Sequence, residues 1–184
     1  MLLCFSLASM APTAPAAVTH PAAGAVRQGE QVFCWGRMEV SASPELVFAV
    51  LTDYDRMADF LPGMLTSEVV SRRGRSVVIE QTADEAVLFF SQQVIVRLAI
   101  EESPPDRLTL RSLAGSFKQF DGSYELTRMA DGTLIEYRSR FVPDFPLPPI
   151  FGTYAVERSL ARHLAALAQE MQRRSSRTPS SRMP

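Results

Sequence analysis

The sequence is poor in the residues from which metal centres and nucleophilic active sites are built. It holds two cysteines, Cys4 and Cys34, and two histidines, His20 and His163. These four residues do not follow the spacing of zinc ligands, and they provide no disulfide framework. We recognise no Ser/His/Asp or Cys/His arrangement and no glycine-rich phosphate loop. We therefore expect no metal, no cofactor and no catalytic constellation.

Positive charge is also scarce in the body of the chain. The 184 residues carry a formal net charge of −1. Residues 1–26 have no charged side chain, whereas residues 172–184 have four arginines and no acid, which leaves −5 for residues 27–171. Domains that bind nucleic acid present a basic face to the phosphate backbone. We therefore expect no nucleic acid as a partner.

Long apolar runs are absent as well, because no segment reaches the about 20 consecutive apolar residues that cross a bilayer. The first ten residues, MLLCFSLASM, are followed by the small residues APTAPAAV. This is the order of a secretory signal with cleavage after Ala16 or Ala17. It lacks one part of such a signal, since no lysine or arginine precedes Arg27. We expect residues 1–26 to be a signal or leader segment of an exported protein, periplasmic or secreted; the alternative is an apolar tail on a cytoplasmic protein.

Two short helices are predicted after a first strand at 31–40. Ser43 is expected to cap the first helix, with Pro44 as its first residue and an end near Leu51. The second is expected near 54–60, with Asp53 as a candidate cap. The acidic residues around it are interpreted as caps and a solvated helix face rather than as paired catalytic carboxylates.

A run of strands and one long helix follow. Asp84 and Glu85 are interpreted as turn residues, and Asp131-Gly132 is a hairpin signal. The expected strands span 66–72, 76–82, 85–103 (one long strand or a bent pair), 107–113, 117–127 and 133–142. Apolar residues at helical spacing predict a helix over 150–174, with a stripe of Tyr154, Val156, Leu160, Leu164, Leu167 and Met171. One domain is therefore expected over 27–174, with a disordered basic tail at 175–184.

Alternation along the strands predicts a sheet with one apolar face. In 133–142, Ile135, Tyr137, Ser139 and Phe141 share one face, and the opposite face carries charged residues. The predicted fold is therefore α+β: a curved seven-stranded antiparallel sheet wrapped around the long C-terminal helix. Because one helix does not fill the concavity of a strongly curved sheet, we expect a pocket.

The residues predicted to line this pocket are apolar with a few polar groups among them. The polar groups would orient a mostly apolar ligand, or they are satisfied core residues; for His163, a flanking or core position is the alternative. The candidate ligand-binding residues are Gln81, Phe90, Gln92, Phe120, Tyr124, Tyr137, Phe141, Tyr154 and His163.

Several segments resemble a known superfamily. The segments VLTDYD at 50–55, FLPG at 60–63, GSYEL at 122–126 and Gly132-Thr133, in this order of elements, are similar to the START-like (helix-grip, SRPBCC) superfamily. The closest likeness is to its polyketide cyclase/dehydrase or coenzyme-Q-binding branch. The resemblance covers residues 31–173 and implies a helix-grip fold whose members bind lipids, quinones or polyketides. It is specific for the fold and weak for activity.

The first functional hypothesis is a carrier or chaperone that binds a small hydrophobic molecule, such as a lipid, a quinone or a polyketide, in the cavity. An aromatase/cyclase that acts on a polyketide is the second. A protein-interaction module is the third, working through the apolar loops 60–65 and 142–151, which we expect to lie close together near the start of the long helix. The same loops are candidates for transient membrane contact.

Overall fold

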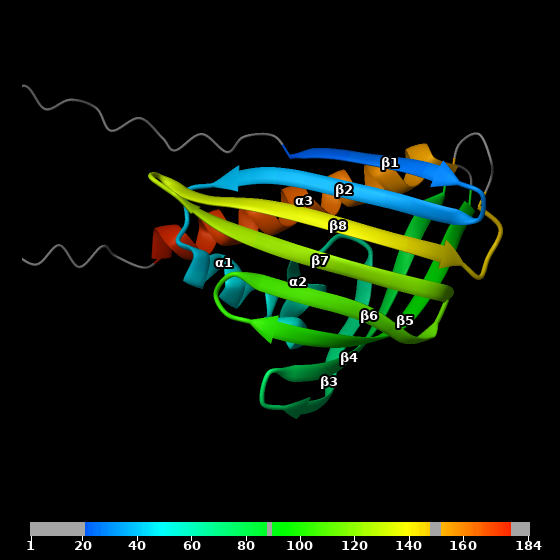
Figure 1. The fold of residues 1–184 in the computed structure, drawn as a ribbon, viewed down its shortest axis with the longest axis horizontal. Coiled ribbons are helices and arrows are strands. Elements are labelled where there is room, and N and C mark those ends of the chain that lie inside the picture. Colours follow the sequence, from blue (N-terminus) through cyan, green and yellow to red (C-terminus); the bar gives the residue numbers. More distant parts are fainter. Residues whose placement is uncertain (1–20, 88–89, 148–151, 178–184) are drawn as a thin grey trace, which may run out of the picture.

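The computed structural model describes residues 21–87, 90–147 and 152–177, together with their side chains outside 85–92. Eight antiparallel strands form one sheet in the order β1-β2-β8-β7-β6-β5-β4-β3, and helix α3 packs against one face of it (Figure 1). The elements are β1 (Ala22–Gln28), β2 (Gln31–Val40), α1 (Pro44–Leu51), η1 (Tyr54–Arg56), α2 (Met57–Phe60), β3 (Met64–Arg73), β4 (Ser76–Val87), β5 (Phe90–Ser103), β6 (Arg107–Gly115), β7 (Phe117–Met129), β8 (Gly132–Pro143) and α3 (Gly152–Arg177).

The predicted α+β helix-grip architecture is confirmed, with eight strands instead of seven. The additional strand is β1, and its residues 22–26 fall inside the segment expected to be a leader. It pairs with β2 along its whole length, from Ala22 opposite Arg37 to Gln28 opposite Gln31. The folded domain therefore begins by residue 22 rather than at residue 27. Residues 1–20 lie outside the described part of the chain, so the signal or leader stays a prediction.

The expected strand over 85–103 was divided wrongly. Asp84 and residues 85–87 continue β4, although Asp84 and Glu85 were expected in a turn. β4 and β5 form a hairpin with unbroken pairing from Ser76 opposite Glu101 to Val87 opposite Phe90. The sequence between the two strands offers no glycine or proline, and this is why the position of the hairpin was missed.

The start of α1 is as predicted, and the second helical segment differs in detail. The Ser43 side chain accepts a hydrogen bond from the backbone N–H of Leu46, 3.3 Å away, and Pro44 is the first helical residue. The segment 54–60 is a 3₁₀ turn followed by a single α-helical turn. Asp53 makes no capping hydrogen bond there. Its carboxylate instead pairs with Arg174 of α3.

Helix α3 supplies the centre of the core. Leu164, Leu167, Ala168 and Met171 are buried, and the helix contacts α1, β1 and β2. It continues to Arg177 and so takes in the first three residues of the segment expected to be a disordered tail; residues 178–184 lie outside the described part. Of the helices that the structure describes, not one combines the length and apolar character that a membrane crossing requires.

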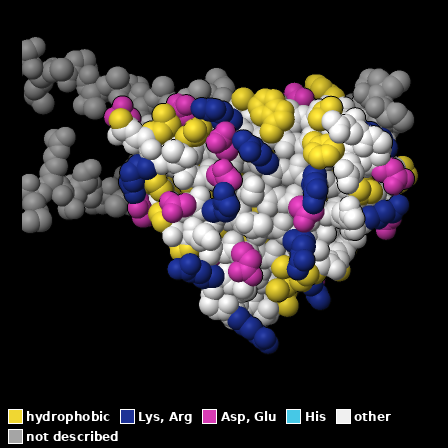
Figure 2. Space-filling view, viewed as in Figure 1, with side chains coloured by type: hydrophobic (Ala, Val, Ile, Leu, Met, Phe, Trp, Pro, Cys, Tyr) yellow, Lys and Arg dark blue, Asp and Glu magenta, His cyan; other side chains and the backbone are white. Residues whose placement is uncertain are grey.

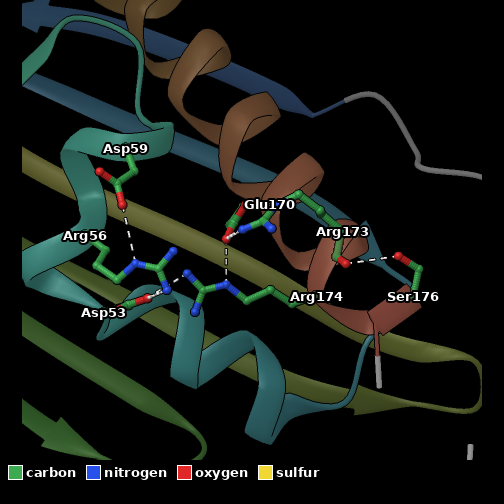
Figure 3. Close-up of polar contacts among 7 residues, drawn as sticks. All are labelled: Asp53, Arg56, Asp59, Glu170, Arg173, Arg174 and Ser176. Carbon is green, nitrogen blue, oxygen red and sulfur yellow. Dashed lines mark hydrogen bonds and ion pairs between the residues drawn. The ribbon is translucent and has the colours of Figure 1, made fainter. Parts of the chain in front are cut away.

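An ionic network fixes the C-terminal end of α3 to η1 and α2 (Figure 3). Glu170 is only 5% exposed and accepts hydrogen bonds from the guanidinium groups of Arg173 and Arg174. Arg174 also donates to Asp53 at 2.6 Å. Arg56 lies 3.8 Å from Asp53 and 3.3 Å from Asp59. Arginines in the last turns of a helix also interact favourably with its C-terminal dipole. The network therefore ties together segments more than 100 residues apart.

Candidate functional site

The concave side of the sheet is not filled by α3. Two adjoining hollows remain between them, which we name chamber 1, of about 250 Å³, and chamber 2, of about 200 Å³. They share six lining residues, namely Ala83, Val94, Phe117, Phe120, Tyr137 and His163. Ligand sites in proteins commonly measure about 300–1,000 Å³, so the two chambers together reach the lower part of this range.

Chamber 1 lies beside the short helices. Leu51, Tyr54 and Met57 line it on one side, and the apolar inner faces of β4, β5 and β6 line the other. The alternation that produces this wall is the predicted one, since Val96, Leu98 and Ile100 of β5 point inward and are buried. Leu167 of α3 also contributes to the lining.

Chamber 2 lies beside the first half of α3 and is rich in aromatic rings. Phe117, Phe120, Phe141 and Phe145 line it, with ring centroids 5.2–6.5 Å apart in four pairs. Aromatic rings at such separations attract one another beyond the effect of burial alone. The wall of chamber 2 is therefore a packed aromatic cluster rather than a loose collection of side chains.

Most polar groups of chamber 1 are already bound to protein partners. The Tyr54 hydroxyl donates to Glu102 Oε1 at 3.0 Å. The Gln81 amide nitrogen donates to Ser67 Oγ at 3.0 Å and lies 3.2 Å from the sulfur of Met57. These hydrogen bonds satisfy groups that would otherwise be costly to bury.

His163 connects α3 with the loop before β3. Its Nε2 lies 3.0 Å from the carbonyl oxygen of Pro62, and because a carbonyl only accepts, Nε2 carries the hydrogen and donates. The ring lines both chambers. It belongs to no cluster of three or more metal-ligating side chains among the described residues.

A group of hydroxyl and thiol side chains lies where the chambers meet. The rings of Tyr124 and Tyr137 are 4.7 Å apart, and burial raises the pKa of both phenols, that of Tyr137 to about 12. Cys34 is opposite Ser139 in the β2–β8 pairing, and burial raises the pKa of its thiol to about 11. The neighbouring Ser139 side chain partly offsets both increases in pKa. All these groups are therefore protonated at neutral pH.

Charged side chains are kept out of the cavity. Among the described residues that line the two chambers there is no Lys, Arg, Asp or Glu. The charges lie on the outer surface of the sheet, where basic and acidic groups are interspersed (Figure 2). Pairs such as Arg97–Glu80 and Arg107–Glu125 form there between neighbouring strands. The cavity is thus an uncharged space inside a charged shell.

The structure brings six of the nine predicted ligand-binding residues to the cavity. Five line chamber 1, and the sixth, Phe141, lines chamber 2. The side chains of Phe90 and Gln92 lie outside the described residues. The five in chamber 1 are Gln81, Phe120, Tyr124, Tyr137 and His163.

The placement of Tyr154 in the cavity was wrong. Its side chain is 54% exposed and lines neither chamber. At about 100° of rotation per residue it lies roughly 120° around the helix from Leu160, which does line chamber 2. Val156 and Ser159 occupy the inward positions instead.

Sequence reasoning missed several lining residues that the strand alternation contains. Cys34 lines chamber 2 and was not among the predicted ligand-binding residues, although Val32, Cys34 and Met38 alternate inward along β2. Ala83 was left outside the predicted strand, and Phe117 was treated only as a strand start. Extending the period-2 pattern of β4 from Gln81 would have found Ala83. Phe117 is out of phase with Phe120, because the pairing of β7 with β8 is irregular between Phe117 and Gln119.

The expected proximity of the two apolar loops near the start of α3 was also wrong. In the loop at 60–65, the Phe60 ring lies 5.8 Å from the guanidinium of Arg174, at the far end of the helix. In the loop at 142–151, Leu147 packs against Gly152 at the helix start, and residues 148–151 lie outside the described part. Transient membrane contact through these loops stays a prediction.

Comparison with known families gives one match over most of the chain. The family model described as "Polyketide cyclase / dehydrase and lipid transport" matches residues 36–172. No curated protein sequence matches the chain.

Solved structures share the fold at low identity. The Zhui aromatase/cyclase from Streptomyces sp. R1128 is 19% identical with a TM-score of 0.67, covering 79% of this chain and 96% of its own. The STAR-related lipid transfer protein from Xanthomonas axonopodis is 14% identical with a TM-score of 0.67, covering 85% and 98%. A START superfamily protein from Mycobacterium smegmatis is 14% identical with a TM-score of 0.66, covering 77% and 97%. At these identities the likeness shows the fold.

Proposed function

The chain belongs to the polyketide cyclase/dehydrase and lipid transport family, and from this premise we propose that it binds a small, mostly apolar molecule in the two chambers as a carrier or chaperone. The observation that carries the proposal is the unfilled, uncharged and aromatic-lined space between the sheet and α3. A protein core is normally packed as densely as an organic crystal, so a hollow of this size lowers stability unless a ligand occupies it.

The apolar lining can supply useful affinity. Burial of about 300 Å² of apolar ligand surface contributes roughly 7 kcal/mol before the costs of association, at about 25 cal/mol per Å². The few polar groups then orient the ligand rather than provide most of the binding free energy.

Protonation favours binding over catalysis at this site. Burial raises the pKa values of Tyr137 and Cys34 to about 12 and about 11, so at neutral pH neither is a base or a thiolate nucleophile. Both keep their protons and remain available as hydrogen-bond donors, the phenol a normal one and the thiol a weak one. A carrier needs such donors and no reactive group.

Two measurements test the proposal. Native mass spectrometry of the protein purified from its own host is expected to reveal a co-purified small molecule. Fluorescence titration with N-phenyl-1-naphthylamine, a neutral apolar probe, is expected to show saturable binding. The variant Ala83→Phe places a ring into the space shared by both chambers and is expected to weaken probe binding at least about tenfold.

The matched control is Ala99→Phe. Ala99 alternates with the buried Leu98 and Ile100 on β5 and therefore faces away from the cavity. Probe binding should be unchanged in this variant. Recovery of empty protein only, with no saturable uptake of the probe, would reject the proposal; so would equal binding by both variants.

An aromatase/cyclase is the second candidate. It is favoured by the hydroxyl groups of Tyr124 and Tyr137 inside the apolar cavity and by the structural likeness to the Zhui aromatase/cyclase. The test is incubation with a linear polyketide while a polyketide synthase produces it. Faster formation of one cyclised product than in buffer, lost in a Tyr137→Phe, His163→Ala double variant, would establish it over the carrier function.

Export is proposed separately. Cleavage after Ala16 or Ala17 would leave β1, which begins at Ala22, intact. The N-terminal sequence of the protein isolated from its host decides the matter. A mature N-terminus between residues 17 and 22 supports export, and an intact leader on cytoplasmic protein contradicts it.

A further inference from the structure

One polar group in chamber 1 differs from the others. Tyr54, Gln81 and His163 each form a hydrogen bond with a protein partner, and the neighbouring Ser139 lowers the pKa of Tyr137. The Tyr124 hydroxyl has no hydrogen bond to any residue that the structure describes, although its ring packs on that of Tyr137. It therefore presents an O–H donor to the open volume.

The surroundings of this hydroxyl are apolar and uncharged. Tyr124 lies on the inner face of β7, with Leu108 of β6 on one side and Tyr137 of β8 on the other. Burial, and to a lesser degree the neighbouring Tyr137, raise its pKa, so it stays protonated. The described residues contain no fully buried side-chain nitrogen or oxygen without a hydrogen-bond partner, so this hydroxyl borders open volume. When an apolar ligand displaces water from the chamber, a donor without an acceptor loses its hydrogen bond. An acceptor atom on the ligand would restore that bond.

The same surroundings disfavour an anion. A carboxylate in this cavity would have to give up its hydration with no described Lys or Arg in the lining to pair with, which is far more costly than burial of a neutral oxygen. The described lining residues include no Lys or Arg, and the segments 85–92 and 148–151 contain neither in their sequence. A neutral oxygen needs only the phenol.

We propose that Tyr124 recognises the ligand by donating a hydrogen bond to a neutral carbonyl-type oxygen, and that the cavity takes uncharged apolar molecules bearing such an oxygen in preference to carboxylate anions. This inference rests on the proposed function, because it names the chemical class of the molecule that the chambers bind. It separates neutral ketones, quinones and polyketide-like molecules from ionised fatty acids.

Three probes of nearly the same shape test the inference by displacement of N-phenyl-1-naphthylamine at pH 8. They are 2-acetylnaphthalene, with a neutral acceptor, 2-ethylnaphthalene, with none, and 2-naphthoate, an anion. The acetyl compound is expected to bind about three- to tenfold more tightly than the ethyl compound. The naphthoate is expected to bind at least about 30-fold more weakly than the acetyl compound.

Two conservative variants assign the effect to one hydroxyl. Tyr124→Phe is expected to abolish the preference for acetyl over ethyl and to leave ethyl binding unchanged. Tyr137→Phe is the matched control, because it removes the adjacent hydroxyl, whose pKa the neighbouring Ser139 lowers, and it should keep the preference. The infrared carbonyl stretch of bound 2-acetylnaphthalene gives a second measurement on wild-type protein, with a lower frequency than in hexane expected.

The possible failures are distinguishable. Naphthoate that binds as tightly as the ketone, a preference that survives Tyr124→Phe, or an unshifted carbonyl stretch would overturn the inference while the proposed function stands. Loss of the preference in both variants would remove the assignment to Tyr124. Absence of binding by all three probes would reject the proposed function as well.

Discussion

Replacement of Glu170 by glutamine should weaken the ionic network that ties the end of α3 to η1 and α2. The carboxylate is 5% exposed and accepts hydrogen bonds from two arginines of its own helix. Those bonds lower its pKa from 4.5 to about 2, against the opposing effect of burial. The amide of the substituted side chain would keep the shape of the carboxylate and lose its charge.

The magnitude follows from that difference in pKa. A depression from 4.5 to about 2 corresponds to roughly 3 kcal/mol, at about 1.4 kcal/mol per unit. We reduce this to about 2–3 kcal/mol, because the Arg173 side chain is 41% exposed and water screens its charge. The folded-state pKa is the lower one, so the contribution is complete above about pH 4.5 and is lost as the pH falls towards 2.

Urea unfolding of wild type and Glu170→Gln at pH 7 and pH 3 is the assay. The free energy of unfolding is expected to fall by about 2–3 kcal/mol at pH 7 and by roughly 1 kcal/mol at pH 3. Its slope with urea concentration, the m-value, should stay unchanged. Glu157→Gln, at an exposed position of the same helix, is the control and should change stability by less than about 0.5 kcal/mol. A loss that is equal at the two pH values, or equal in the control, would refute the reasoning.

Three further predictions concern single positions. Gly36→Ala is expected to lower the free energy of urea unfolding by about 1–3 kcal/mol, because its Cβ would lie 2.5 Å from Cδ1 of the buried Leu164. An unchanged urea midpoint would show that Leu164 can move away without loss of stability. Burial raises the pKa of the Cys34 thiol from 9.0 to about 11. In a Cys4→Ser background, Cys34 should therefore react with a disulfide reagent at pH 8 about 100-fold more slowly in folded than in urea-unfolded protein. Similar rates in the two states would contradict this. Ser43→Ala should cost about 1 kcal/mol through loss of the α1 cap, and no loss would mean that water replaces it.

The walls of the cavity could be predicted because strand alternation is a local property. On β8, Tyr137 and Phe141 lie inward with Ser139 between them, while Arg138 and Arg140 are exposed, in the predicted phase. Each position follows from its neighbours two residues away, and no long-range information is needed.

The features that were missed depend on partners distant in sequence. β1, with the sequence AAGAVRQ, has little strand propensity of its own and is set by its pairing with β2. The Asp53–Arg174 pair joins residues 121 positions apart, so Asp53 looked like a cap from its local sequence. Tyr154 was placed by extending the apolar stripe of α3 beyond Leu160, where the stripe turns away from the sheet.

Stability and ligand binding should be separable in this fold, because the chambers adjoin α3 mainly along its first half, whereas the ionic network lies at its C-terminal end. Leu164, Leu167 and Met171 of its second half belong to the main core, and Leu147 belongs to a smaller cluster beside its first half. Glu170 lines neither chamber, so Glu170→Gln should lower stability and leave the affinity for 2-acetylnaphthalene unchanged. Tyr124→Phe should leave the stability unchanged and lower the affinity for 2-acetylnaphthalene, since the Tyr124 hydroxyl forms no hydrogen bond with the described residues. A ligand that fills the chambers supplies contacts that the first half of the helix lacks. The stabilisation by the ligand should grow as its concentration exceeds Kd, by the same amount in wild type and in Glu170→Gln.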